Sequence, residues 1–148
     1  MKITILANKD LASCIALNRL LPLLQDHELY IFLSAKVGKS DTLPQALLDL
    51  NFYEQRLFNN IVFPLATALG IDSAALKTFD AIGKYIGREI LELNAINSSD
   101  FEQFKSTQPD LVLCIRYGGI LREAVIAVPR FGVLNLHSGL LPQYKGVM

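Results

Sequence analysis

The chain has 148 residues, of which 51% are hydrophobic and 19% charged, and its formal net charge is zero. This length is typical of one domain with a buried core, and a neutral chain without a basic run gives no strong signal for nucleic-acid binding. No apolar segment is long enough for a signal peptide or a membrane span, so we expect a cytoplasmic protein.

The first 34 residues predict two strands with a helix between them. Residues 2–7 and 28–34 are rich in apolar and β-branched side chains, as expected for buried strands. Between them, Asp10 is placed to N-cap a helix, and Pro22 should kink or end it because proline cannot donate a backbone hydrogen bond.

The region 43–88 is longer than a single crossover helix requires. A helix is expected from an N-cap at Thr42 up to Pro64, and a second from about residue 72 to about residue 85, ended by Gly87. Their apolar and aromatic side chains recur near helical spacing. We therefore predict an inserted helical pair that packs on the sheet or forms a homodimer contact.

The second half of the chain continues the alternation of strands and helices. Ser99 and Glu102 have the spacing of a capping box ahead of a short helix that stops before Pro109. Further strands are expected at 89–93, 110–115 and 133–136, the last of them short and buried, and a further helix at 120–128. The order predicts the α/β class, with a Rossmann-like parallel sheet of about five strands, flanking helices and a helical insertion.

Metal and dinucleotide sites are not indicated by the sequence. Cys14 and Cys114 lie among apolar residues without metal-ligand spacing, which is typical of reduced, buried thiols. The turn after the first strand lacks the Gly-x-Gly-x-x-Gly pattern of dinucleotide-binding folds.

The last predicted strand ends in a polar pair, Asn135 and His137, before a turn rich in Gly and Pro. Side chains alternate along a strand, so both should project to the same face at its carboxyl end, where open parallel sheets bind ligands. An amide can donate to a developing oxyanion, and an imidazole can move protons. The alternative is that both residues simply cap the end of the strand.

The residues around this pair resemble the sequence of a known enzyme family. Asn135-Leu-His137 is followed by Leu140-Leu-Pro142 and then Tyr144-Lys-Gly146. This pattern resembles the signature of the 10-formyltetrahydrofolate-dependent formyltransferases, which include enzymes acting on methionyl-tRNA, glycinamide ribonucleotide and amino-sugar nucleotides. Lys145 departs from the arginine usual there, and the resemblance covers roughly residues 109–146.

The resemblance implies transfer of a formyl group from 10-formyltetrahydrofolate to an amine, with methionyl-tRNA or an amino-sugar nucleotide as the expected acceptor. It implies that Asn135 holds the formyl oxygen and that His137 supports it and moves protons. It also places a set of residues against the folate, namely Tyr117, Gly119, Ile120, Leu121 and Ile126. For Ile126, the core face of a helix is an equal alternative, and for Arg116 we expect an ordinary surface salt bridge.

One catalytic residue of the family has no counterpart here. The family uses an Asp beyond the His, past the position where this sequence ends at Met148. We therefore expect residues 1–148 to be a formyltransferase N-terminal domain that is incomplete at its C-terminal end and inactive by itself. The alternative is a non-catalytic folate-binding or scaffold module derived from a formyltransferase.

Overall fold

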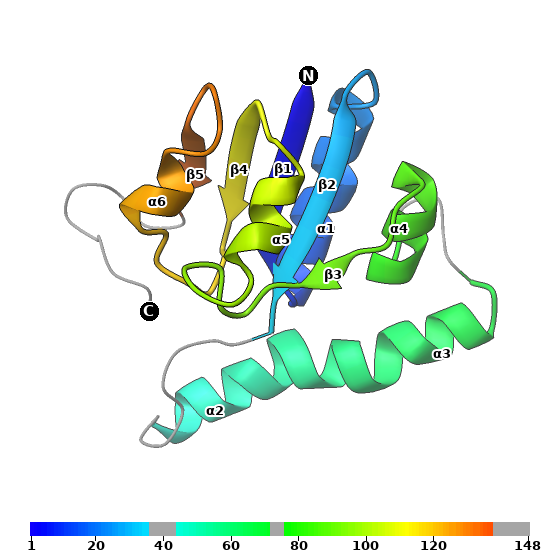
Figure 1. Cartoon of the computed structure of the whole chain (residues 1–148). Helices are drawn as coiled ribbons and strands as arrows, with labels where there is room; N and C mark the ends of the chain where they lie inside the picture. The colour runs from blue at the N-terminus through cyan, green and yellow to red at the C-terminus, as the bar shows by residue number, and fades with distance from the viewer. Residues whose placement is uncertain (36–43, 72–75, 138–148) are drawn as a thin grey trace.

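The computed structural model describes residues 1–35, 44–71 and 76–137 (Figure 1). All strand pairs in its five-stranded sheet are parallel, in the order β3-β2-β1-β4-β5. The strands are β1 (Lys2–Asn8), β2 (Glu28–Ser34), β3 (Leu91–Glu92), β4 (Leu111–Ile115) and β5 (Val133–Leu136). The Rossmann-like α/β class predicted from the sequence is confirmed.

Helices cover both faces of the sheet, because each face carries its own apolar cluster. On one face, Ile5 of β1 packs with Leu17 of α1 (Leu11–Leu20) and Ile82 of α4 (Phe79–Ile86). On the other, Leu6 packs with Phe104 of α5 (Phe101–Ser106) and Val125 of α6 (Glu123–Ile126). Alternate residues of β1 thus belong to different clusters, as the strand period requires.

Three local signals are confirmed. The Asp10 carboxylate accepts a hydrogen bond from the Ser13 amide at 2.7 Å and so caps α1. α1 ends at Leu20, and Pro22 lies in the 3₁₀ turn that follows. Gly87 ends α4 in the left-handed conformation, with φ of 68°.

Two expected helix starts are wrong. α4 begins at Phe79, not near residue 72, because the Thr78 hydroxyl caps it by accepting from the Ala81 amide at 3.2 Å. α5 begins after Asp100, so the capping box at Ser99 does not form. The Asp100 carboxylate instead accepts from the Ala95 amide at 2.7 Å and from the Ser99 hydroxyl at 2.9 Å.

Three elements of the second half also differ from prediction. β3 and α6 are shorter than the expected ranges 89–93 and 120–128, and residues 120–122 form an extended turn ahead of α6. The expected burial of β5 is wrong: Leu134 is 61% exposed and Leu136 63%. In the described sheet β5 pairs only with β4, and its apolar run therefore lies at an edge.

The inserted helix is one continuous run that continues beyond Pro64. α2 (Gln45–Asn51) leads through the π-helical turns Phe52–Arg56 and Phe58–Val62 into α3 (Phe63–Ala68). Pro64 is the second residue of α3, directly after the π-helical turn Phe58–Val62, and the run continues through it. The run crosses the carboxyl ends of the strands (Figure 1), and the expected N-cap Thr42 lies outside the described residues.

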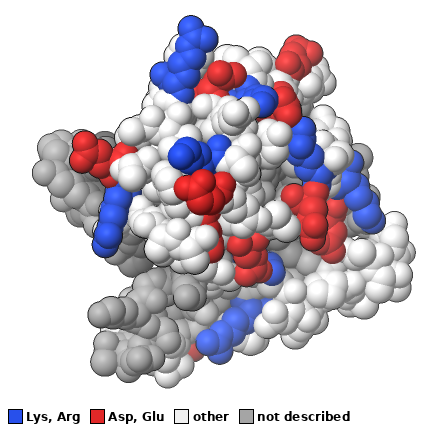
Figure 2. Space-filling model, viewed as in Figure 1, with Lys and Arg blue, Asp and Glu red and all other residues white. Residues whose placement is uncertain are grey.

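The second half of this run exposes apolar side chains and no charge. Leu65 and Leu69 are 55% and 61% exposed, residues 57–71 contain no charged side chain, and the surface over α3 is white in Figure 2. Elsewhere on this view, acidic and basic side chains are interspersed. The homodimer contact stays a prediction. Within the described ranges, no helix has the length and apolar character that a membrane crossing requires.

Candidate functional site

Asn135 lies at the carboxyl edge of the sheet. In the parallel register it is paired with Cys114, and the next pair, Ile115 with Leu136, ends both strands. Paired residues of neighbouring strands share a face, and Cys114 belongs to the apolar cluster under α5 and α6. The Asn135 side chain is therefore on the α5/α6 face, and it is exposed to solvent.

His137 and the turn after β4 lie at the same edge. His137 follows β5 directly and is half-buried, while Tyr117 and Leu121 pack into the cluster on the α5/α6 face. Because β4 and β5 end at paired residues, the 117–121 turn and the Asn–His pair leave the sheet side by side. Strand alternation predicted only that Asn135 and His137 share a face, and their joint role in a site beside this turn stays a prediction.

Tyr117 anchors the turn to the buried cluster on the α5/α6 face. Its ring is buried, and its hydroxyl donates to the backbone carbonyl of Leu93. Burial, reinforced by the negative charge of Asp100, raises the pKa of the Tyr117 hydroxyl. Tyr117 therefore stays a neutral donor and supports the turn.

Asn97 clamps the other end of the turn. Its side-chain amide donates to the Ile120 carbonyl at 2.7 Å, and its oxygen accepts from the Arg122 amide at 2.9 Å. These two bonds hold residues 120–122 in an extended path, which is why α6 starts only at Glu123. Sequence reasoning missed Asn97, since nothing local links it to a turn so far along the chain.

The clamped turn presents apolar side chains to solvent. Ile120 is 85% exposed and Ile126 is 46% exposed, whereas Leu121 is partly buried against the α5/α6 cluster. Among the described residues, Ile120 is thus the most open apolar group at this edge. An exposed branched side chain beside polar groups can pack on a flat aromatic ligand.

Gly119 is required by a close approach. A Cβ placed there would lie 3.1 Å from Cε1 of the Tyr117 ring, tighter than ordinary van der Waals contact. Gly119 therefore lets the turn fold over Tyr117.

A second polar group lies where β1 and β4 end. Arg116 Nε lies 3.2 Å from the fully buried carboxylate of Asp10, and its Nη2 lies 3.0 Å from Glu54 on the inserted helix. A salt bridge is thus present, but it is not the ordinary surface pair that was expected, because Glu54 is partly exposed whereas Asp10 is fully buried. The Asp10 carboxylate also accepts from Asn8 at 2.9 Å.

The two cysteines are free and buried. Burial, with the negative charge of Asp10, raises the pKa of the Cys14 thiol to about 12, and burial also raises that of Cys114. Neither is a thiolate nucleophile at neutral pH. No group of three or more His, Cys, Asp or Glu side chains in the described parts of the chain could hold a metal ion.

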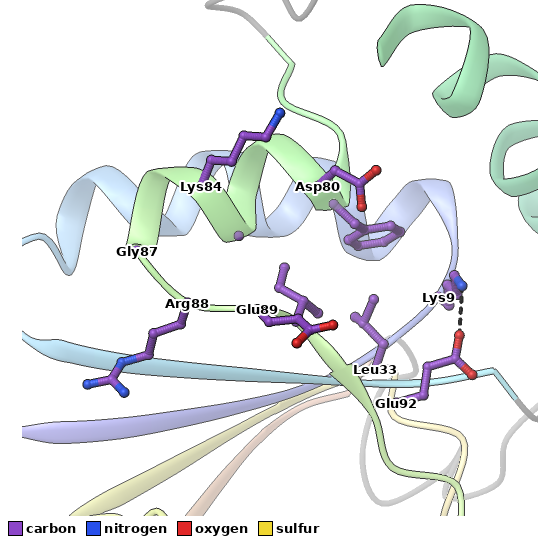
Figure 3. Close-up of a pocket in the computed structure, with 11 residues that line it drawn as sticks. Lys9, Leu33, Asp80, Lys84, Gly87, Arg88, Glu89 and Glu92 are labelled. Atoms are coloured by element: carbon purple, nitrogen blue, oxygen red, sulfur yellow. Dashed lines mark hydrogen bonds and ion pairs between the residues drawn. The ribbon is translucent and has the colours of Figure 1, made fainter. Parts of the chain in front are cut away.

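A cavity of about 500 Å³ lies away from this site, between α4 and the β2–β3 side of the sheet (Figure 3). Its lining mixes apolar side chains such as Leu33 with three cationic and three acidic ones, including the Lys9–Glu92 pair at 2.6 Å. None of the predicted site residues lines it. The cavity belongs to the α1/α4 face and the opposite half of the sheet.

A parallel α/β sheet with an Asn–His pair at the carboxyl end of its edge strand is a fold and site suited to group transfer to or from a carbonyl carbon. The family model described as formyl transferase matches residues 75–148, half of the chain. The chain belongs to the formyl transferase family.

Similar proteins support this family. Methionyl-tRNA formyltransferase of Halorhodospira halophila is 43% identical over 51 residues, which are 34% of this chain and 16% of that protein. The enzyme of the same name from Chlamydia caviae is 47% identical over 45 residues, 30% and 14% of the two chains. That of Macrococcus caseolyticus is 37% identical over 62 residues, 41% and 20%. The chain thus spans a fifth or less of the length of these relatives.

Proposed function

We propose that this chain contributes to transfer of a formyl group from 10-formyltetrahydrofolate to a primary amine. The observation that carries the proposal is the exposed Asn135 amide at the carboxyl edge of the sheet, beside the clamped 117–121 turn. Family membership supports formyl transfer in general, and the Asn-x-His spacing supports this location.

Asn135 is proposed to stabilise the oxyanion. The amine nitrogen attacks the formyl carbon, a C–N bond forms, and the carbonyl oxygen takes the displaced electron pair. An amide N–H aimed at that oxygen stabilises this charge more than the ground-state carbonyl. Asn135 fits this role because its exposed side chain leaves room for the formyl group.

His137 is proposed to assist the same step and to move protons. The bond from the formyl carbon to the folate nitrogen breaks as the tetrahedral intermediate collapses. The attacking nitrogen loses a proton and the departing folate nitrogen gains one, so an imidazole at the edge of the sheet can carry both changes. Its position directly after β5 places it on the same edge as Asn135.

The folate is proposed to lie against the turn. The exposed Ile120 and Ile126 side chains offer apolar surface for the pterin ring, and Tyr117, Gly119 and Leu121 hold the turn in shape. An apolar wall with a few fixed polar groups is the usual composition of a small-molecule site.

The acceptor is proposed to be methionyl-tRNA or an amino-sugar nucleotide. The similarity to methionyl-tRNA formyltransferases favours methionyl-tRNA. The net charge of zero favours the smaller acceptor, because tRNA binding draws on clustered cationic side chains.

The test is the rate of formyl transfer in the full natural protein with Asn135→Ala. We expect turnover to fall about 10²-fold or more, since losing one oxyanion donor costs a few kcal/mol of barrier. Asn18 is not a suitable control because it is partly buried and bonds the Lys77 backbone, so the exposed Asn60 of the inserted helix is changed to Ala instead. Unchanged turnover in Asn135→Ala would refute the role, and folate binding without turnover in the parent would favour a non-catalytic folate-binding module.

A further inference from the structure

Arg116 adopts a backbone conformation that side-chain-bearing residues disfavour. Its φ is 56°, in the left-handed region, at the point where the chain leaves β4 and enters the 117–121 turn. Such a conformation costs free energy and persists only where surrounding contacts impose it. The direction of the turn therefore depends on what holds Arg116.

The first contact is a fixed carboxylate. Asp10 is fully buried, and besides Arg116 it accepts hydrogen bonds from the Ser13 amide at 2.7 Å and the Asn8 side chain at 2.9 Å. A carboxylate held at the start of α1 cannot move independently of the sheet. The 3.2 Å contact from Arg116 Nε thus ties the turn to the rigid body of the domain.

The second contact comes from the inserted helix. Glu54 lies in the π-helical turn Phe52–Arg56 and meets Arg116 Nη2 at 3.0 Å. The same helix donates from Asn59 to the Lys9 carbonyl at 2.7 Å. Two polar contacts therefore dock the insertion where β1 and β4 end, and one of them runs through Arg116.

We propose that Arg116 is a positioning residue that couples the inserted helix, residues 45–68, to the donor-binding turn 117–121. By bridging Asp10 and Glu54, its guanidinium holds the strained backbone that aims Ile120 at the folate. The insertion lies outside the segment matched to the family, residues 75–148, so this coupling adds a determinant that the family match does not include. The inference rests on the proposed donor site.

The experiment measures the affinity of the whole chain for 5-formyltetrahydrofolate by isothermal titration calorimetry. Arg116→Gln removes both ion pairs, and we expect it to weaken binding about tenfold; Glu54→Gln removes one, and we expect about threefold. The double variant should bind no more weakly than Arg116→Gln alone, because Glu54 acts through Arg116. Arg116→Lys should be intermediate, since an ammonium cannot bridge two carboxylates as a guanidinium fork does.

The matched control is Arg88→Gln. This variant breaks the Arg88–Glu28 ion pair, whose side chains are 40% and 41% exposed, similar to those of Arg116 and Glu54. The pair lies away from the turn, so the variant should leave the affinity for 5-formyltetrahydrofolate unchanged. Hydrogen exchange at the amides of 117–121 provides a readout that needs no ligand. Exchange there should quicken in the Arg116 and Glu54 variants and stay at the parent rate in Arg88→Gln.

The outcomes separate this inference from the proposed function. A parent chain that binds no folate refutes the donor site, and the exchange data then decide the coupling alone. A parent that binds, with Glu54→Gln and Arg116→Gln unchanged in affinity and exchange, overturns the coupling, as do additive effects in the double variant. If Arg116→Gln does not fold, Glu54→Gln carries the same test.

Discussion

The surroundings of the Cys14 thiol, which determine its pKa, come from distant parts of the sequence. It is fully buried on α1, its thiol donates to the Lys77 carbonyl at 3.2 Å, and the Asp10 carboxylate lies nearby. Burial and that negative charge both disfavour the thiolate, so the pKa of Cys14 rises from 9.0 to about 12. Its apolar neighbours in sequence predicted a buried thiol. The hydrogen bond to the Lys77 carbonyl could not be predicted, because only the tertiary fold brings the two residues together.

This shift predicts a loss of stability at alkaline pH. Because the pKa is higher in the folded state, the folded protein retains a proton that the unfolded chain releases above about pH 9. The contribution to the free energy of unfolding is complete below pH 9 and declines as the pH rises toward 12. Urea unfolding of the parent and Cys14→Ala at pH 7 and 10 checks this: the parent should lose more stability. Parallel losses would contradict it.

The candidate site was only partly predictable at the level of single residues. Asn135 and His137 could be proposed from their own spacing, because strand alternation is local, and their role stays a prediction. Asn97 and Glu54 could not be found in this way, since each bonds a turn brought near by the fold. For Tyr117, the sequence identified its turn but not its buried hydrogen bond to Leu93.

At the scale of the elements, local caps were predictable where a side chain had no competing partner. Asp10 and Gly87 act as expected at the ends of α1 and α4. Ser99 does not cap α5, because the Asp100 carboxylate is drawn back to the Ala95 amide and the Ser99 hydroxyl follows it. β5 was predicted to be buried from its apolar run, yet the position of a strand within a sheet is a long-range property.

Because central elements are buried and the edge strand is exposed, truncating a side chain to alanine should lower the free energy of unfolding by different amounts in the two places. Phe104 of α5 is fully buried in the α5/α6 cluster, so Phe104→Ala should lower the free energy of unfolding by about 3–5 kcal/mol. Leu136 on β5 is 63% exposed, so Leu136→Ala should change it by about 0.5 kcal/mol or less. Chemical denaturation of both variants measures the contrast, and comparable losses would show that β5 is covered.

On the scale of the whole molecule, the residues of the proposed site meet at the carboxyl edge of the sheet. Asn135 lies near the end of β5 and His137 directly after it, the clamped turn follows β4, the buried Asp10 follows β1, and the inserted helix crosses beneath them (Figure 1). The alternation of elements predicted the parallel sheet, which is confirmed, and the candidate site at its carboxyl edge stays a prediction. It did not predict the path of the insertion, which depends on Phe63 packing against Phe79 and on polar contacts from Glu54 and Asn59.

The most direct test of the central claim is a map of where a folate binds. At 16.4 kDa the chain suits amide NMR, with 5-formyltetrahydrofolate titrated into the labelled protein. The account predicts that the largest shifts cluster at residues 117–121, at Ile126 and at Asn135 and His137. Shifts confined to the cavity between α4 and β3, around Asp80 and Lys84, would contradict it, as would no shifts at all.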